Sequence, residues 1–186
     1  MKKFVLLFVL VAMLAAGTAF ADHPDGWGVG IVGGWGYGIG EAYGLSLKIP
    51  SIPVFWSVNL AAGSHYFRFG LTGDYYLIDS ALSIPTLHWF LGVGGFFNFY
   101  SWSYKYNWDG GDYSYTSMNF GARVPIGVSW QPIPLVEVFL DVAPSLGAHF
   151  DGGHKYKKKN GDEVKEGAHF RFLFGLPIEL GLRLWF

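Results

Sequence analysis

The sequence of 186 residues contains no cysteine, which excludes a small domain held together by disulfides. It is also poor in charge: 15% of the residues are charged, against about 25% in an ordinary soluble domain. Because 51% of the residues are hydrophobic and 19% are aromatic, the composition excludes a disordered chain as well. Beyond residue 21, no apolar run reaches the roughly 18 residues of a membrane-spanning helix. The chain is therefore too apolar for a water-facing surface, yet its body offers no membrane helix.

Glycine, in contrast, is abundant: the 27 glycines are about twice the usual share. They follow no triplet period, so the chain is not collagen-like. The glycine-dense stretch from Gly26 to Gly40 precedes no predicted helix, and therefore it is not a dinucleotide-binding fingerprint.

Residues 1–21 have the form of a cleaved secretory signal peptide. Lys2 and Lys3 precede an apolar core, and residues 19–21 form an A-x-A cleavage site. The apolar run is short for a membrane anchor, which needs about 20 residues, and no basic cluster follows it. We therefore predict a mature chain of residues 22–186 that is exported by a bacterium. It carries 11 basic and 14 acidic residues, a balance that does not favour a nucleic-acid partner.

In the body of the chain, apolar residues recur with a period of two, as they do in strands. All nine even-numbered positions from Phe170 to Phe186 are apolar, whereas the odd-numbered positions include Arg171, Glu179 and Arg183. Successive side chains of a strand point to opposite faces, so this strand has one apolar face and one polar or small face. The same split elsewhere predicts eight strands in all, over residues 27–37, 43–49, 54–62, 66–77, 87–99, 118–131, 136–142 and 170–186.

The breaks between these strands alternate in kind. Three are short or compact and marked by proline, at residues 50–53, 79–85 and 131–134, whereas two on the other side, about 102–116 and 151–167, are long and polar. Short turns on one side and longer loops on the other are typical of outer-membrane barrels. We therefore predict an all-β fold, an eight-stranded antiparallel up-and-down transmembrane β-barrel over residues 22–186. Both termini lie with the short turns, on the periplasmic side.

Alternation alone does not decide which face points inward. A soluble barrel of the lipocalin kind buries the apolar face, whereas a membrane barrel shows it to lipid. The membrane orientation is favoured because the polar face is rich in glycine and in charges of both signs, and because only the loops are strongly hydrophilic. Tryptophan and tyrosine also gather near strand ends, as in interfacial girdles. Side chains fill the interior of an eight-stranded barrel, so inward glycines would make room for large charged groups.

The predicted inward face carries five basic and four acidic side chains. Unpaired charges are costly in a narrow interior, so we expect these nine groups to pair with one another and fill the lumen. The alternative is a narrow gated pore for small solutes or ions, with the same groups as its gate. The nine residues are Lys48, Arg68, Asp74, Arg123, Glu137, Asp141, Arg171, Glu179 and Arg183.

No catalytic, cofactor or metal site is predicted. His88, His149 and His169 near strand ends could serve a hydrolase, but no nucleophile motif such as G-x-S-x-G is present. His149, His154 and His169 lack the spacing of metal ligands. The charged inner face also argues against a carrier of hydrophobic ligands.

The two long loops are the candidates for recognition, because binding residues concentrate in loops. Residues 104–113 mix aromatic and turn-forming residues, which favours a β-hairpin extending above the membrane over a binding tip. In residues 153–166 a lysine run is followed by acidic residues, which favours a solvated hairpin over a site for sulfated glycans or anionic lipid. The surface-binding candidates are Tyr104, Tyr106, Trp108, Tyr113, Lys155, Lys157, Lys158 and Lys159.

The chain ends on an aromatic residue that follows an alternating apolar run. This is the form of the C-terminal signal that the barrel-assembly machinery of outer membranes recognises. We therefore predict that machinery and outer-membrane lipid as partners, and no cofactor. The residues of the signal are Leu180, Leu182, Leu184 and Phe186.

Two motifs carry a family resemblance, Gly121 to Val128 (GARVPIGV) and Leu135 to Pro144 (LVEVFLDVAP). With residues 44–48 and 181–186, they resemble a poorly characterised family of small spirochaete outer-membrane barrels, related in architecture to the transmembrane domain of OmpA-type proteins. The resemblance implies an integral eight-stranded barrel at the cell surface and no agreed activity. We predict a structural or adhesin-like surface-binding role, with a host or other extracellular ligand at the loops and no catalysis.

Overall fold

The computed structural model describes residues 23–24, 26–37, 42–105, 112–157, 162–165 and 167–186. Side chains at 37, 42, 104–105, 112, 153–157 and 163–165 lie outside that description. Within the described residues, no helix is long and apolar enough to cross a membrane. The strands are β1 (Gly28–Tyr37), β2 (Ala42–Lys48), β3 (Phe55–Ala62), β4 (Tyr66–Ala81), β5 (Leu87–Lys105), β6 (Asp112–Arg123), β7 (Ile126–Ile133), β8 (Val136–Val142), β9 (Ser145–Lys157), β10 (Glu163–Lys165) and β11 (His169–Trp185).

The strands form a closed antiparallel ring of eight barrel strands. Two of these barrel strands are each divided into two shorter strands by a proline. Pro125 separates β6 from β7, and Pro144 separates β8 from β9. Backbone hydrogen bonds continue across both junctions: Val124 N donates to Pro144 O at 2.9 Å, and Ala143 N donates to Pro177 O at 2.9 Å. The ring runs β1, β2, β3, β4, β5, β6/β7, β8/β9, β11 and closes through β1 and β11, while β10 pairs with β9 outside it. The predicted eight-stranded antiparallel barrel is confirmed.

The strands of the ring are strongly staggered. The stagger is seen by following register partners once around the ring. The path starts on β11 at Phe172 and returns to β11 at Leu182, ten residues further along the strand. Such a stagger tilts the strands against the barrel axis and leaves an interior that side chains can fill. The residues on this path are Phe172, Ala148, Phe120, Phe97, Leu71, Val58, Leu45, Ile31 and Leu182.

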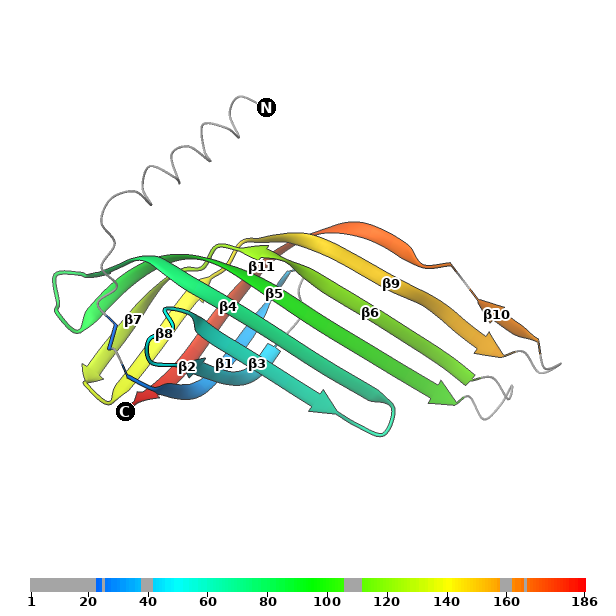
Figure 1. The fold of residues 1–186 in the computed structure, drawn as a ribbon, viewed down its shortest axis with the longest axis horizontal. Coiled ribbons are helices and arrows are strands. Elements are labelled where there is room, and N and C mark those ends of the chain that lie inside the picture. Colours follow the sequence, from blue (N-terminus) through cyan, green and yellow to red (C-terminus); the bar gives the residue numbers. More distant parts are fainter. Residues whose placement is uncertain (1–22, 25, 38–41, 106–111, 158–161, 166) are drawn as a thin grey trace, which may run out of the picture.

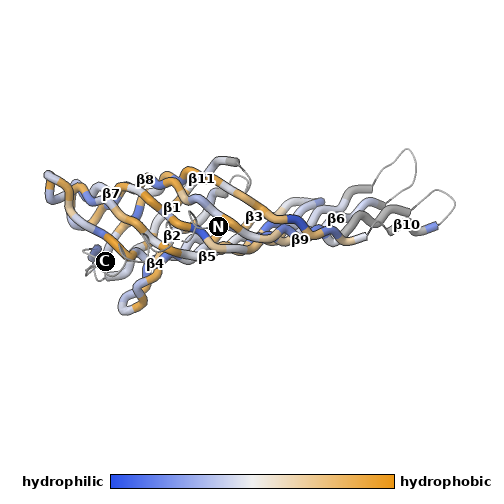
Figure 2. The backbone as a smooth tube through the Cα atoms, turned by 90° about the horizontal axis from the view of Figure 1, so that it is seen from above, coloured by the Kyte–Doolittle hydropathy of each residue, from blue (hydrophilic) through white to orange (hydrophobic). Residues whose placement is uncertain are grey.

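The apolar face of the strands points outward. On β11, Leu180 and Leu182 are 46% and 41% exposed, whereas Arg183 between Leu182 and Leu184 is 1% exposed. Charged side chains inside and leucines outside are the reverse of a soluble barrel. The exposure pattern therefore confirms the predicted orientation. Figure 2 shows apolar residues over most of the ring, with a more hydrophilic chain towards β10.

The two ends of the barrel differ (Figure 1). What we call the turn end holds the connections 49–54, 82–86 and 134–135, together with the start of β1 and the end of β11. At the opposite end, the loop end, β5, β6 and β9 extend beyond the shorter strands β1 to β3. Both described chain ends thus lie at the end with the compact connections.

The predicted boundaries at the loop end are wrong. The segments 102–116 and 151–167 are strand over much of their length, since β5 reaches Lys105, β6 begins at Asp112 and β9 covers Ser145–Lys157. Lysine, glycine and tyrosine dominate there, so no apolar alternation marks these strands in the sequence. The hairpin interpretation of the first segment is confirmed, because β5 and β6 pair out to Lys105 and Asp112.

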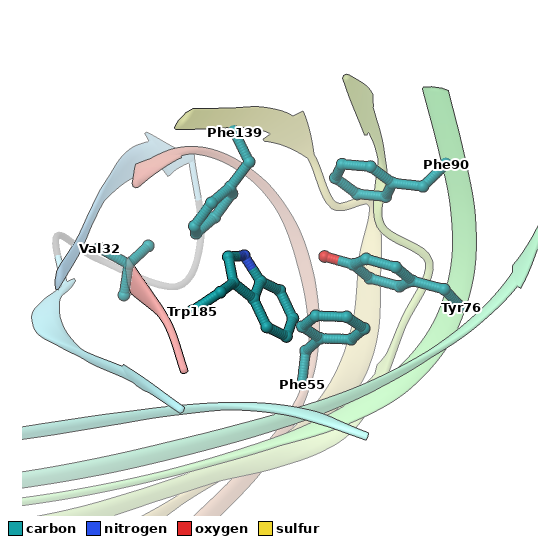
Figure 3. Packing of buried hydrophobic residues seen from close by; sticks show 6 residues of the cluster. All are labelled: Val32, Phe55, Tyr76, Phe90, Phe139 and Trp185. Carbon is teal, nitrogen blue, oxygen red and sulfur yellow. The ribbon is translucent and has the colours of Figure 1, made fainter. Parts of the chain in front are cut away.

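Aromatic side chains fill the turn end of the interior (Figure 3). The rings of Phe55 and Tyr76 stack at 4.2 Å, and those of Tyr76 and Phe90 stack at 4.3 Å. Offset aromatic stacks of this kind add to the free energy of burial. The whole apolar cluster comprises Val32, Phe55, Tyr76, Phe90, Phe139 and Trp185.

Candidate functional site: the charged lumen

Arg183 is the centre of a first charged group, at the turn end. Its Nη1 donates to Glu137 Oε2 at 2.7 Å, and its Nε and Nη2 donate to Ser46 Oγ at 3.1 and 3.0 Å. Trp185 Nε1 donates to the same Glu137 oxygen at 2.9 Å. Glu137 is fully buried, so this carboxylate has exchanged its water for a guanidinium and an indole. We call these four residues the Arg183 group.

Aromatic rings and a glycine complete the surroundings of Arg183. Its guanidinium carbon lies 4.7 Å from the centre of the Phe55 ring and 4.5 Å from that of Phe139, close enough for cation–π attraction. A Cβ at Gly28 would lie 2.7 Å from Arg183 Cδ, so the long side chain occupies space that glycine leaves open. This is the use of inward glycine that the composition predicts.

Arg123 is the centre of a second group, further into the barrel. Its two terminal nitrogens donate to the two carboxylate oxygens of Glu179, both at 2.7 Å, in the bidentate geometry typical of strong arginine pairs. Its Nε lies 3.1 Å from Asp74 Oδ1, and its Nη2 lies 3.9 Å from Asp141 Oδ1. One guanidinium thus holds three carboxylates from three other strands; we call these four residues the Arg123 group.

On the loop-end side of the Arg123 group, a phenyl ring lies across the interior. A Cβ at Gly121 would lie 2.8 Å from the Phe96 ring, and one at Gly147 would lie 2.9 Å from it. The ring therefore fills the space above two neighbouring glycines. Phe96 is 5% exposed, so its ring is part of the filling of the interior on this side.

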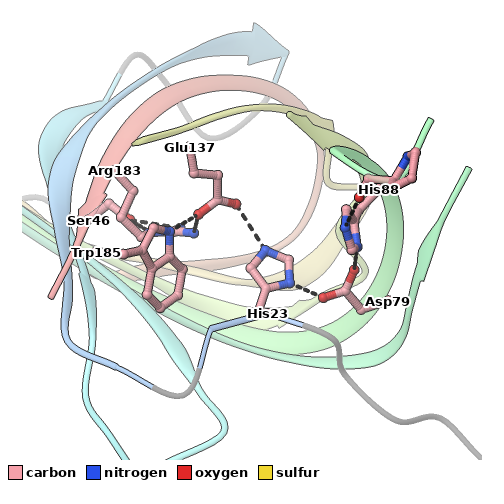
Figure 4. Close-up of polar contacts among 8 residues, drawn as sticks. His23, Ser46, Asp79, His88, Glu137, Arg183 and Trp185 are labelled. Atoms are coloured by element: carbon pink, nitrogen blue, oxygen red, sulfur yellow. Dashed lines mark hydrogen bonds and ion pairs between the residues drawn. The ribbon is translucent and has the colours of Figure 1, made fainter. Parts of the chain in front are cut away.

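His23, which the sequence does not mark, lies inside the turn end (Figure 4). It precedes β1, and its side chain is 4% exposed. Its Nε2 donates to Glu137 Oε1 at 2.9 Å, and its Nδ1 contacts Asp79 Oδ2. Its ring also packs edge-on against Phe55, at 5.0 Å between centroids. No periodic signal could have found this residue, because it lies outside every strand.

Asp79 and His88 are two further interior residues, of which the sequence pattern marks only His88, as a histidine near a strand end. Asp79 was assigned to a break, but β4 extends to Ala81 and carries its side chain into the interior, where it is completely buried. His88 Nδ1 lies 3.3 Å from Asp79 Oδ1, and His88 Nε2 donates to Pro85 O at 3.0 Å. The turn-end cluster, which we define as His23, Asp79, His88 and the Arg183 group, is therefore continuous across the barrel.

The nine predicted lumen charges divide into three sets. Six lie in the Arg183 and Arg123 groups, and Lys48 is buried at the turn end, where its Nζ donates to Ile49 O at 3.0 Å. Arg68 is half-buried and Arg171 is exposed, both towards the loop end, and neither forms an ion pair with any residue that the structure describes. The structure therefore brings seven of the nine into the buried interior and leaves two outside the paired groups.

The loop candidates lie mostly outside the described part. Tyr113 is in β6 and exposed; Tyr104, Lys155 and Lys157 belong to strands whose side chains there are not described. Tyr106, Trp108, Lys158 and Lys159 fall outside the described residues altogether. At the other end, the predicted assembly signal is on the outer face, since Leu180, Leu182, Leu184 and Phe186 are exposed.

Little free space remains between the two charged groups. A cavity of about 20 Å³ lies there, lined among others by Thr72, Asp74 and Asp141. That is space for about one water molecule. Within the described residues, no group of three histidine or carboxylate side chains is arranged to hold a metal ion.

Comparison with known proteins identifies the fold. A major outer membrane protein from Thermus thermophilus superimposes with a TM-score of 0.52 at 14% sequence identity, over 86% of this chain and 98% of that one. The chain has the fold of an outer-membrane β-barrel. Neisserial surface protein A is also matched, with a TM-score of 0.38 and 17% identity over 86% of this chain and 94% of that one. No protein-family model and no curated protein matches the sequence.

Proposed function

We propose that the protein is an integral protein of a bacterial outer membrane, with a filled lumen and a structural or surface-binding role. The observation that carries the proposal is the inverted ring: Leu180 and Leu182 face outward while Arg183 and Glu137 are buried inside. An apolar outer band with a polar interior is the arrangement that lipid requires. Both termini are then periplasmic, the loop end is extracellular, and the C-terminal strand is read by the barrel-assembly machinery.

The filled lumen supports a structural or binding role over transport. The cavity of about 20 Å³ between the charged groups is too small for a solute, and the aromatic stack of Phe55, Tyr76 and Phe90 occupies the turn end. Recognition would therefore fall to the loop end, where β5, β6 and β9 carry the chain away from the ring. We also propose that the chain is similar to small spirochaete outer-membrane barrels, on the motifs at residues 121–128 and 135–144.

Cysteine labelling tests the membrane orientation directly, because the chain has no cysteine of its own. Leu180→Cys and Glu179→Cys are neighbours on β11 that differ in face. In lipid vesicles, a lipid-phase maleimide should label the cysteine at 180 and spare the cysteine at 179. Equal labelling of both would contradict the membrane barrel.

Planar-bilayer conductance of the refolded protein tests the filled lumen. We expect no reproducible channel steps. Regular steps that disappear in Arg123→Ala would instead establish a narrow pore gated by the Arg123 group. For the binding role, a screen of host and other extracellular ligands should find one that the full chain binds and that variants lacking residues 104–113 or 153–166 do not.

A further inference from the structure

The turn end of the barrel is closed by a residue that is not part of its wall. His23 lies outside the ladder of the ring and is held by side chains of β3, β4, β8 and β11, namely Phe55, Asp79, Glu137 and Trp185. Figure 4 shows its imidazole near the middle of the ring, between Asp79 on one side and Glu137 on the other. Two opposite walls of the lumen are thus joined through one side chain of the N-terminal segment.

The backbone just after His23 is shaped for entry into the barrel. Trp27 N donates to Phe186 O at 3.1 Å, and Phe186 N donates to Trp27 O at 2.8 Å, so the two strands remain paired up to the last residue of the chain. A Cβ at Gly26 would lie 2.3 Å from Phe186 O. Only glycine therefore allows the segment to pass this carbonyl and direct His23 inward.

The groups around His23 explain why the site selects an imidazole. Asp79 and Glu137 are both buried carboxyl groups, and Arg183 already donates to the other oxygen of Glu137. A side chain with a polar atom at each end is needed to span the two, and a neutral imidazole does so with one N–H, which donates to Glu137, and one unprotonated nitrogen, which faces Asp79. Histidine offers Nδ1 and Nε2 on opposite sides of one rigid ring, and the aromatic residues Phe55, Tyr76 and Trp185 pack against its faces and edges.

We propose that the turn end is a binding surface for the chain's own N-terminal segment, and that His23 is a removable plug which seals the lumen from this side. The plug is held by contacts that can separate without opening the ring, because its described residues 23, 24 and 26 form no strand. Its release uncovers Asp79 and His88, and next to His88 in the β5–β7 register lies Ser129, which is 1% exposed. With the leader removed after residue 21, as the sequence predicts, the plug is the second residue of the mature protein.

Thiol accessibility in the full mature chain tests this proposal. Ser129→Cys places one thiol beside His88, whose ring lies 6.3 Å from that of His23, and Ser145→Cys places a matched thiol, 2% exposed as serine, deeper in the barrel. Each is combined with the native His23 and with His23→Ala, and the rate of reaction with a small charged thiol reagent is measured by mass spectrometry in detergent. We expect His23→Ala to accelerate labelling at 129 at least tenfold and to leave the rate at 145 unchanged.

Two outcomes would overturn the plug. If labelling at 129 is equally slow without His23, the segment does not seal the turn end. If labelling at 145 rises as much as at 129, the substitution loosens the whole barrel rather than uncovering its mouth. Gly26→Val gives a second test that leaves the buried side chains unchanged. It should displace the N-terminal segment at Phe186 and accelerate labelling at 129 by a similar factor. The absence of any acceleration would again count against the proposal.

The unaltered protein offers an independent measurement. Diethyl pyrocarbonate should modify the exposed His65 and His169 at least ten times faster than His23. A rate at His23 equal to that at His65 would show that the plug is not seated. Neither measurement depends on the membrane assignment, so the plug and the proposed function can fail separately.

Discussion

The interior of this barrel treats its arginines in two different ways. At the turn end and in the middle, Arg183 and Arg123 are almost completely buried and each is bound to a carboxylate at 2.7 Å. Towards the loop end, Arg68 and Arg171 also project from inward positions of their strands but form no ion pair within the described part of the chain. The difference follows from access to water. A guanidinium inside the closed ring has no water to replace a missing carboxylate, whereas a guanidinium near the open end is hydrated. Pairing in this lumen is therefore imposed by closure of the ring and not by the strand pattern alone.

The largest effect that would sharpen this comparison is the loss of Arg183. Arg183→Ala leaves Glu137 buried without its cation, and we expect the free energy of unfolding to fall by about 3–5 kcal/mol. Urea unfolding in lipid vesicles, followed by the gel shift between folded and unfolded barrel, measures it. The double variant Arg183→Met with Glu137→Leu removes both charges and should recover most of the loss; if it does not, packing and not charge accounts for the effect.

The outer face should show the same contrast between the two ends. Leu180→Arg places a charge on the lipid side of the ring and should destabilise the barrel by about 2–4 kcal/mol if it lies near the bilayer midplane. Phe172 lies on the same outer face of β11 but eight residues nearer the loop end, so Phe172→Arg should cost only about 0–1 kcal/mol if that position lies near the membrane surface. Equal costs in the same unfolding assay would mean that both positions lie at one depth.

The close packing around Phe96 can be tested by crowding it. A Cβ at Gly121 would lie 2.2 Å from Leu146 O and 2.8 Å from the Phe96 ring, so Gly121→Val must displace both the backbone of β9 and the ring, and overpacking of this kind destabilises by about 1–3 kcal/mol. Gly167→Val is the matched control, because a Cβ there meets nothing within 4 Å. A loss confined to Gly121→Val, measured by unfolding, would show that the lumen next to the Arg123 group has no free space; equal losses for both variants would contradict this.

The binding of His23 at the turn end should depend on pH. Burial lowers the pKa of the His23 imidazole below its ordinary value, and the facing Glu137 carboxylate opposes this shift without cancelling it. A free imidazole therefore binds a proton more readily than a seated one, so lowering the pH through the range of free histidine weakens seating. His23 is faced by Asp79 and Tyr76 from β4, His88 from β5, Glu137 from β8 and Arg183 from β11.

We accordingly expect Ser129→Cys to react several times faster at pH 5 than at pH 8, after correction for the reactivity of the free thiol. Ser145→Cys should show no such acceleration. In the His23→Ala background the pH dependence at 129 should disappear. If it persists there, another group causes it.

The smallest effect is expected for the arginines near the loop end. Arg171→Ala removes a guanidinium that is exposed and has no ion-pair partner in the described chain, and the free energy of unfolding should change by less than about 0.5 kcal/mol. The half-buried Arg68 should behave in the same way. A loss near that of Arg183→Ala would show that Arg171 has a buried partner and would remove the distinction between the two ends.

The sequence predicted the ring well, because lipid on one side and a crowded lumen on the other impose a period of two. Residues 118–131 alternate on both sides of Pro125 and form one barrel strand, although the proline interrupts its regular pairing. At the loop end the same method fails, since strands that protrude beyond the ring have no apolar face: on β9 the alternation of Leu146, Ala148 and Phe150 stops at Asp151. The interior could be predicted only as a set of inward charges. Which of these charges meet depends on the stagger of ten residues around the ring, and the pattern of a single strand does not reveal that stagger. The contact between His23 and Asp79 joins residues 56 positions apart in the sequence, so no local pattern indicates it.

The prolines that divide the barrel strands have a mechanical consequence. Pro125, Pro144 and Pro177 lie on three neighbouring strands, joined by the bonds from Val124 to Pro144 and from Ala143 to Pro177. Each proline lacks an amide proton, so the wall carries fewer cross-links along this line than elsewhere. Opposite Pro177, Gly36 has a φ of +150°, a conformation that side chains rarely adopt. We therefore expect this line to be the least stiff part of the wall, where the barrel would bend first when the surrounding bilayer is compressed or thinned.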